Sequence, residues 1–279
     1  MSTFKHKPAT RGLNTEIIHS KPVSHEGFSA LPVPVYRGSS TFFENTAAQR
    51  APVNPIGLDY SYGLHGNPTQ YTLAKKLAEI EGATHALVCP SGLTGIALVA
   101  QACLKGGDHW VIPENVYGPV QALARSLQAD YGVEFSEYDP YDAASLNALL
   151  QPNTKLVWTE APGSLTFEVP DLKEILKLAK AHGARTGIDN TWAAGIAYKP
   201  FEHGFDFSIQ ALTKYQCGHA DVLMGAVLSN NTRAFADVER KNRVLGLGVS
   251  PADCDLVLRG LLTLPLRYKQ QAENGLVVA

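Results

Sequence analysis

An acid and a lysine, each placed after an apolar run, are the residues of this chain best suited to chemistry. Asp189 ends the run that contains Gly187 and Ile188, and Lys214 follows the run 208–212. Pyridoxal phosphate needs an amine to hold its aldehyde as a Schiff base and a carboxylate to keep its pyridine nitrogen protonated. Asp189 and Lys214 match these two needs. A helix cap and a solvated surface lysine would give the same isolated pair, so the interpretation needs support from other residues.

A glycine turn ahead of a helix supplies that support. The run 91–95, Ser-Gly-Leu-Thr-Gly, follows an apolar strand candidate and opens an apolar helical stretch. Backbone amides at such a turn face an anion, and the helix dipole adds positive potential. We therefore expect a phosphate over Gly92 and Leu93. Serine and glycine are also the ordinary cap and turn residues, so it is the order of acid, lysine and turn that indicates a phosphate-bearing cofactor.

The elements that must position these residues alternate along the chain from Gly66 onward. Apolar strand candidates alternate with amphipathic helices, which predicts an α/β fold with a mostly parallel sheet and helices on both faces. The expected strands are 86–88, 109–112, 133–138, 156–159, 185–188, 207–210 and 226–229. The expected helices are 70–81, 96–104, 119–130, 143–150, 172–181, 231–240 and 252–262. The candidate residues then fall at the carboxyl ends of strands, where open α/β sheets bind ligands.

Seven tracts in this order resemble those of a known family, the pyridoxal-phosphate enzymes of cysteine and methionine metabolism. They are 62–69, 91–93, 116–119, 160–164, 188–195, 213–215 and 218–221. The resemblance runs from Tyr60 to the end of the chain and is strongest to the bacterial cystathionine beta-lyases. It implies the aspartate-aminotransferase-like fold, that is, the large domain of fold type I.

The resemblance also implies a role for individual residues. Lys214 would form the Schiff base and remove the Cα proton of the substrate, while Asp189 would pair with the pyridine nitrogen. Tyr117 would stack on the cofactor ring as a catalytic residue. Thr213 would give its hydroxyl to the phosphate, and Ser164 would approach the ring hydroxyl. Without the resemblance, we would interpret Tyr117 as a core residue and the hydroxyls of Thr213 and Ser164 as turn or cap groups.

Two positions depart from the pattern of the family. An arginine that binds the phosphate of the neighbouring subunit usually stands where this chain has Leu64. A charge-assisted hydrogen bond is worth about 1.5–3 kcal/mol, so cofactor affinity should fall unless another donor substitutes. Many relatives also carry a serine where this chain has Ala211. Alanine at this position therefore indicates a smaller subgroup of the family.

The first sixty residues differ from the rest because prolines at positions 22, 32, 34, 52 and 55 break regular structure. In the resembled family, an arm of this kind reaches over a neighbouring subunit and places Tyr62 in that subunit's active site. A disordered tail is the alternative, but Phe42, Phe43 and Tyr60 make the segment more apolar than most tails. We therefore expect a homo-oligomer, a dimer of dimers, in which Tyr62 acts as a catalytic residue across the interface.

The function implied by the resemblance is beta-elimination of cystathionine to homocysteine, pyruvate and ammonia, a step of trans-sulfuration and methionine biosynthesis. Two alternatives stay open. The chain could act at Cγ, as cystathionine gamma-synthase or methionine gamma-lyase does, or it could bind cofactor or partner subunits with little catalysis. The tracts 162–169 and 189–195 favour the beta-lyases.

Composition fits a cytoplasmic enzyme with a small-molecule substrate. The 279 residues are 45% hydrophobic with a formal net charge of −2, so no basic face is available for nucleic acid. No apolar run is long enough to span a membrane. The four cysteines are widely spaced and no clustered histidines accompany them, so we expect reduced thiols and no metal site.

The end of the chain still has a helical pattern when it reaches Ala279. We therefore expect three segments: an N-terminal arm at 1–60, a cofactor-binding large domain at 61–262, and the start of a linker helix at 263–279. That helix would lead to a C-terminal domain absent from this chain.

Overall fold

The computed structural model describes residues 32–52, 54 and 59–279, so most of the expected N-terminal arm lies outside the described residues. The chain divides into two units, Met1–Pro34 and Val35–Ala279. Only positions 32–34 of the first unit are described. The helices and strands of the described residues lie in the second unit, Val35–Ala279.

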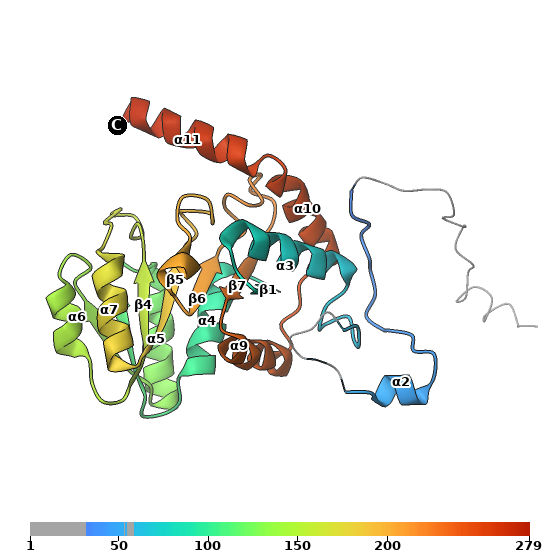
Figure 1. Ribbon diagram of the computed structural model, residues 1–279, viewed down its shortest axis with the longest axis horizontal. Helices are drawn as coiled ribbons and strands as arrows, with labels where there is room; N and C mark the ends of the chain where they lie inside the picture. The colour runs from blue at the N-terminus through green and yellow to red at the C-terminus, as the bar shows by residue number, and fades with distance from the viewer. Residues whose placement is uncertain (1–31, 53, 55–58) are drawn as a thin grey trace, which may run out of the picture. The chain divides into compact units, whose positions relative to one another are not determined.

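A seven-stranded sheet lies at the centre of this unit, in the order β1-β7-β6-β5-β4-β2-β3 (Figure 1). The strands are β1 (His85–Cys89), β2 (His109–Pro113), β3 (Glu134–Tyr138), β4 (Thr154–Glu160), β5 (Arg185–Asp189), β6 (Phe207–Gln210) and β7 (Gly225–Ser229). The strands from β3 to β6 pair in parallel, whereas β7 is antiparallel to both β6 and β1. All seven expected strands are present, with ends shifted by at most two residues, and the mostly parallel α/β fold is confirmed.

Helices cover both faces of this sheet. The longer ones are α3 (Pro68–Glu81), α4 (Gly92–Cys103), α5 (Gly118–Tyr131), α6 (Ala143–Leu149), α7 (Leu172–His182), α9 (Thr232–Leu245), α10 (Pro251–Leu261) and α11 (Leu264–Val278). Side chains of α4, α5 and α9 share one apolar core with strand residues such as Trp110 and Ile209. The neighbouring strand residues point the other way, so Val111 packs with α6 and α7, and Leu228 with α3 and α10.

Two short helices were not expected from the sequence. These are α2 (Thr46–Arg50) and α8 (Pro200–His203). Each is too short to show the apolar repeat by which a helix is recognised. In the described part of the chain, no helix combines the length and the apolar character needed to cross a membrane.

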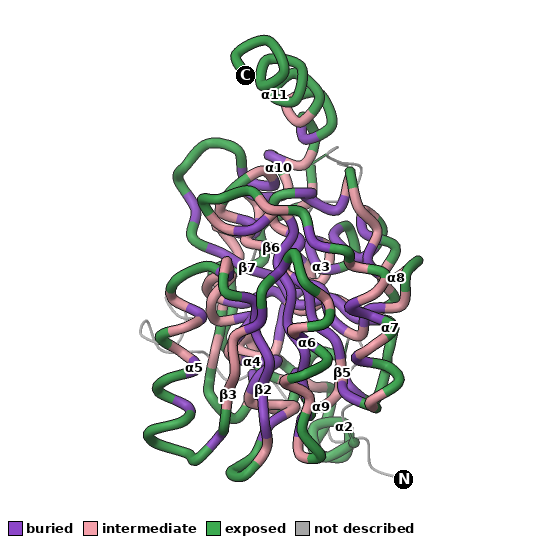
Figure 2. Tube along the Cα trace, turned by 90° about the vertical axis from the view of Figure 1, so that its left-hand side faces the viewer, coloured by how far each residue is buried: buried purple, intermediate pink, exposed green. Residues whose placement is uncertain are grey.

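The final helix, α11, has a different environment from the others. Leu264 is its one buried residue, and Figure 2 shows nearly all of the remaining helix as exposed. Leu276, Val277 and Val278 each leave more than four fifths of their surface open. The expectation of a linker helix at 263–279 stays a prediction.

A buried acid at the end of α3 connects this helix to two strand ends. Glu81 is 2% exposed. It accepts hydrogen bonds from Asn190 Nδ2 at 2.7 Å, from Gln210 Nε2 at 3.0 Å and from Ser208 Oγ. Burial raises the pKa of Glu81, and the three hydrogen bonds oppose that rise. The network continues because Gln216 Nε2 donates to Gln210 Oε1 at 2.9 Å.

Removing this acid should cost much of the stability of the fold. In Glu81→Ala, the buried donors of Asn190, Ser208 and Gln210 lose their acceptor, and we expect unfolding in urea to require about 3 kcal/mol less free energy. Glu79→Ala is the control, because this exposed glutamate of the same helix makes only a surface ion pair with Lys76. The control should change the free energy of unfolding by less than about 0.5 kcal/mol. Equal effects of the two substitutions would contradict the structural role of Glu81.

Candidate active site

The carboxyl ends of β4, β5 and β6 open into a cavity of about 840 Å³. Its wall includes the start of α4, the loop after β4 and the segment after β6. Seven of the eight predicted site residues line it. They are Gly92, Leu93, Tyr117, Ser164, Asp189, Thr213 and Lys214.

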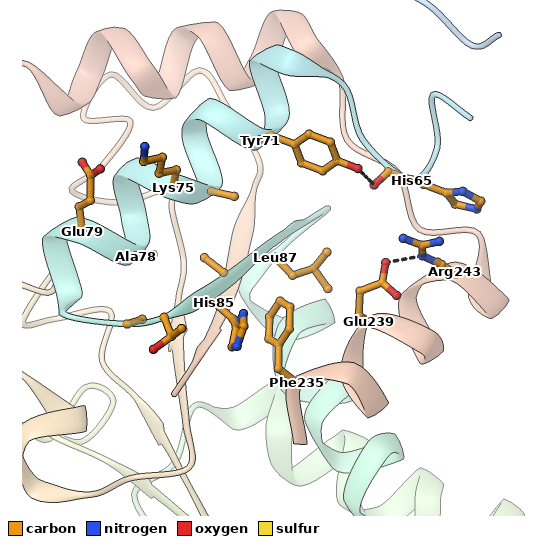
Figure 3. Close-up of a pocket in the computed structure, with 14 residues that line it drawn as sticks. His65, Tyr71, Lys75, Ala78, Glu79, His85, Leu87, Phe235, Glu239 and Arg243 are labelled. Atoms are coloured by element: carbon orange, nitrogen blue, oxygen red, sulfur yellow. Dashed lines mark hydrogen bonds and ion pairs between the residues drawn. The ribbon is translucent and has the colours of Figure 1, made fainter. Parts of the chain in front are cut away.

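A second cavity, of about 490 Å³, lies between α3, β1 and α9 (Figure 3). Arg243 Nε donates to Glu239 Oε1 in its wall, and Tyr71 donates its hydroxyl to the carbonyl of His65 at 3.3 Å. None of the predicted site residues lines this cavity. It also lies beside His85, at the beginning of β1, away from the strand ends that bear Asp189 and Lys214. We therefore place the candidate active site in the first cavity.

The glycine turn presents two backbone amides to the cavity. Ser91 caps α4 by accepting from Thr94 N at 3.0 Å, and the Ser91 carbonyl accepts from Gly95 N at 3.1 Å. The amides of Gly92 and Leu93, in contrast, have no acceptor among residues 32–52, 54 and 59–279. Two free amides at the positive end of a helix form a site for a phosphate.

Close packing makes glycine necessary in this turn. A Cβ atom at position 92 would lie 2.9 Å from the Cβ of Ala211 and 3.2 Å from its Cα. The segment after β6 therefore approaches the start of α4 as closely as a glycine allows. This contact brings the phosphate cradle next to the segment that bears Lys214.

Asp189 lies at the end of β5, in register with Glu160 of β4 and Ile209 of β6. Its Oδ1 accepts from Thr191 N at 3.0 Å. Burial raises the pKa of Asp189, while hydrogen bonds from Thr191 and the positive charge of Lys214 act in the opposite direction. The acid and the lysine predicted from the sequence are thus close enough to interact electrostatically.

The remaining predicted residues lie around this pair. Lys214 is exposed to the cavity, and its backbone is held by hydrogen bonds to Ala211 and from Gly218. Thr213 Oγ1 donates to the carbonyl of Met224 at 3.2 Å and accepts from Met224 N at 3.1 Å, so this hydroxyl is already engaged with the backbone. Ser164 is fixed through its amide, which donates to the Asn115 carbonyl at 3.0 Å.

Comparison with known proteins identifies the family. A family model described as "Cys/Met metabolism PLP-dependent enzyme" matches residues 14–279. The chain belongs to this family. A putative cystathionine beta-lyase of Rhizobium johnstonii is 37% identical over 270 residues, which cover 96% of this chain and 66% of that protein. A cystathionine beta-lyase of Bordetella avium is 36% identical over 256 residues, which cover 90% of this chain and 64% of that protein.

Solved structures agree with this assignment. The crystal structure of cystathionine gamma synthase from Xanthomonas oryzae pv. oryzae in complex with cystathionine superposes with a TM-score of 0.80 at 33% identity. The match covers 86% of this chain and 60% of that chain. The fold is that of the aspartate-aminotransferase-like enzymes. This chain spans about two thirds of the length of the two curated relatives from Rhizobium and Bordetella.

Members of this family depend on pyridoxal phosphate, and the cavity fits that cofactor. The free amides of Gly92 and Leu93 suit its phosphate, Asp189 suits its pyridine nitrogen and Lys214 suits its aldehyde. The described residues contain no group of three or more His, Cys, Asp or Glu side chains that could hold a metal ion.

Tyr62 stands apart from the other predicted residues. It is 49% exposed and does not line the cavity of its own chain. A β-bridge to Ser40 and a hydrogen bond from Gly63 N to the Ser39 carbonyl fix its backbone. Its expected role in the site of a neighbouring subunit stays a prediction.

The residues of the cavity wall that were given no site role from the sequence include Glu160, Arg267 and Gln271. Glu160, at the end of β4, lines the cavity and accepts from Tyr117 N at 2.8 Å. An acid directly after an apolar run is the same signal that led to Asp189, so the pattern was present. Arg267 and Gln271 of α11 also line the cavity, and the neighbouring Tyr268 donates to the Trp192 carbonyl at 3.3 Å. No sequence pattern indicated that α11 would approach the site.

Filling the close contact at position 92 should disrupt the phosphate cradle. In Gly92→Ala, the added methyl group would meet Ala211, which overpacks the contact by about 1–3 kcal/mol. We expect the dissociation constant for pyridoxal phosphate, measured by absorbance titration, to increase about tenfold. Gly92→Ala combined with Ala211→Gly should recover most of the affinity.

Gly118→Ala is the matched control, because this glycine also begins a helix beside the cavity and no atom lies within 4 Å of its added Cβ. Its affinity should match that of the wild type. The packing explanation fails if the two alanine variants lose affinity equally or if the double variant shows no recovery.

Proposed function

We propose that this chain carries out the pyridoxal-phosphate-dependent beta-elimination of cystathionine to homocysteine, pyruvate and ammonia. The observation that carries the proposal is the convergence of Lys214, Asp189 and the free amides of Gly92 and Leu93 on one cavity. The beta-lyase relatives from Rhizobium and Bordetella support the choice of reaction.

Each residue has a distinct part in this proposal. When bound, pyridoxal phosphate supplies a ring that accepts electrons from the substrate Cα. Lys214 would hold the aldehyde of the cofactor and would take the proton from the substrate Cα. Asp189 would accept a hydrogen bond from the ring nitrogen and favour its protonated form. Tyr117, which is 45% exposed at the cavity wall, would pack its ring against the cofactor.

The two hydroxyls hold the cofactor in the same proposal. Ser164 would approach the ring hydroxyl, and Thr213 would donate its hydroxyl to the phosphate in place of its hydrogen bond to the Met224 carbonyl. Both residues lie in the cavity wall.

The proposal includes further copies of the chain. In a cytoplasmic dimer of dimers, Tyr62 of one subunit would enter the cavity of its neighbour, which agrees with its exposure and its distance from the lining of its own cavity. Residues 61–262 would bind the cofactor. Residues 263–279 would lead to a C-terminal domain that completes the substrate site.

Reaction at Cγ is the second candidate. The solved structure of the Xanthomonas cystathionine gamma synthase in complex with cystathionine shares the fold at 33% identity, so the same framework serves an enzyme of that name. A chain that holds the cofactor with little turnover is a further alternative.

The position of Lys214 predicts where the cofactor attaches. Borohydride reduction of the protein loaded with pyridoxal phosphate, followed by peptide mapping, should label Lys214. Lys214→Ala should abolish the label. A label on Lys199 or Lys241 in the wild type would show that the assignment is wrong.

The products distinguish the two candidate reactions. With cystathionine as substrate, beta-elimination yields pyruvate and gamma-elimination yields 2-oxobutyrate. We expect pyruvate, identified by chromatography of the derivatised oxo acid, and a decrease of about 10²- to 10⁴-fold in Lys214→Ala because the Cα base is lost. If 2-oxobutyrate were the main product, the proposal of a beta-lyase would be wrong and the Cγ alternative would stand.

A further inference from the structure

Glu160 contacts two residues that the proposed function uses. Its Oε2 accepts from the amide of Tyr117 at 2.8 Å. On its other side, Glu160 is paired in register with Asp189 across the parallel strands β4 and β5. Residues in register on adjacent strands point to the same face of the sheet, so the two carboxyl groups are neighbours at the cavity wall.

This proximity restricts the charge that the pair can carry. Glu160 is 9% exposed, so little water is available to screen it from Asp189. Two neighbouring carboxylates in such surroundings do not ionise together without a large electrostatic cost, and one of them keeps a proton. Thr191 donates to Asp189 Oδ1 and Lys214 adds positive charge, and both favour the ionised form of Asp189. For Glu160, the described residues supply one amide donor, Tyr117 N, and no cation acts on its pKa.

We propose that Glu160 is a positioning residue that fixes Tyr117 and Asp189 relative to each other. Before the cofactor binds, Glu160 keeps a proton beside the ionised Asp189, and it loses this proton more readily once the cofactor is in place. The inference rests on the proposed function, in which Tyr117 packs on the cofactor ring and Asp189 pairs with its nitrogen. One side chain would thus set both the plane of the ring and the charge of its partner.

The electrostatics of the site support this assignment. Burial and the negative charge of Asp189 raise the pKa of Glu160 to about 8, against the opposing hydrogen bond from Tyr117. The charged and titratable groups in the same cavity wall are Tyr117, Asp189, Lys214, Tyr215 and Arg267. Glu160 therefore titrates in a range where binding can be measured.

Cofactor binding and this titration are linked. A cationic ring beside Asp189 favours the ionised form of Glu160, so binding lowers the pKa of Glu160 and releases a proton. The affinity of the wild type for pyridoxal phosphate should therefore increase as the pH rises through 8. Other titrating groups also change the affinity with pH, but they do so equally in the wild type and in variants at position 160. If binding lowers the pKa by about one unit, this contribution amounts to about fivefold between pH 7 and 9.5.

Two variants separate the roles of Glu160. Glu160→Gln keeps an oxygen that accepts from Tyr117 N and imitates the protonated acid, but it cannot ionise. Glu160→Ala removes the acceptor and leaves the amide of Tyr117 unpaired. Glu168→Gln is the control, because it removes a negative charge from the nearby loop at a residue that does not line the cavity.

The experiment measures the dissociation constant for pyridoxal phosphate by absorbance titration from pH 6.5 to 9.5, after dialysis against hydroxylamine to remove bound cofactor. Thermal unfolding of each variant shows that it is folded. At pH 7, we expect Glu160→Gln to bind within about twofold of the wild type and Glu160→Ala about tenfold more weakly. The ratio of the Glu160→Gln constant to the wild-type constant should increase about fivefold between pH 7 and 9.5. The same ratio for Glu168→Gln should stay constant.

Specific results would overturn the inference. A ratio for Glu160→Gln that stays constant with pH would exclude the proton on Glu160, and an alanine variant that binds like the wild type at pH 7 would exclude the positioning role. If Glu160→Ala does not fold, the positioning role is tested by Glu160→Gln alone. Binding of pyridoxal phosphate by Glu160→Gln that is much weaker than that of the wild type at pH 7 would then exclude this role. Failure of the wild type to bind the cofactor at any pH would instead overturn the proposed function, and this inference with it.

Discussion

The register of three parallel strands is the constraint on which the candidate site depends. Glu160 pairs with Asp189, and Asp189 pairs with Ile209, so β4, β5 and β6 end at one level. A slip of one residue in β5 would turn the side chain of Asp189 to the opposite face of the sheet. The apolar residues of these strands prevent such a slip, because Ile188 and Ile209 are fully buried in cores on the two faces.

Two contacts outside the sheet keep the ends of these strands aligned. Glu81 binds Asn190, next to Asp189, and Gln210, at the end of β6, so one buried acid joins both strands to α3. At the front, the contact of Gly92 with Ala211 places the free amides of α4 beside the segment that bears Lys214. The lysine, the acid and the phosphate cradle come from different elements, and their separation is set by these two contacts together.

The sequence predicted the parts of the site that depend on local patterns. Asp189 and Lys214 follow apolar runs, and Gly92 opens a helix, so their places at strand and helix ends could be inferred. Glu160 has the same pattern as Asp189, but its significance depends on a partner that only the strand register reveals. The approach of Arg267 to the cavity depends on how α11 docks, and tertiary packing of that kind leaves no periodic signal. The role proposed for Tyr62 involves a second chain, whose position one sequence does not predict.

The electrostatics of the cavity explain why the cofactor and the wall suit each other. Burial raises the pKa of both Asp189 and Glu160, so this wall disfavours two negative charges in adjacent positions. A cationic ring nitrogen beside Asp189 would offset this repulsion, while the phosphate would place its charge at the positive end of α4, away from the acids. In the proposed binding mode, each charged end of pyridoxal phosphate would thus meet the opposite charge in the cavity. This polarity would orient the cofactor, and Tyr117, whose amide donates to Glu160, would have only to fix the plane of the ring.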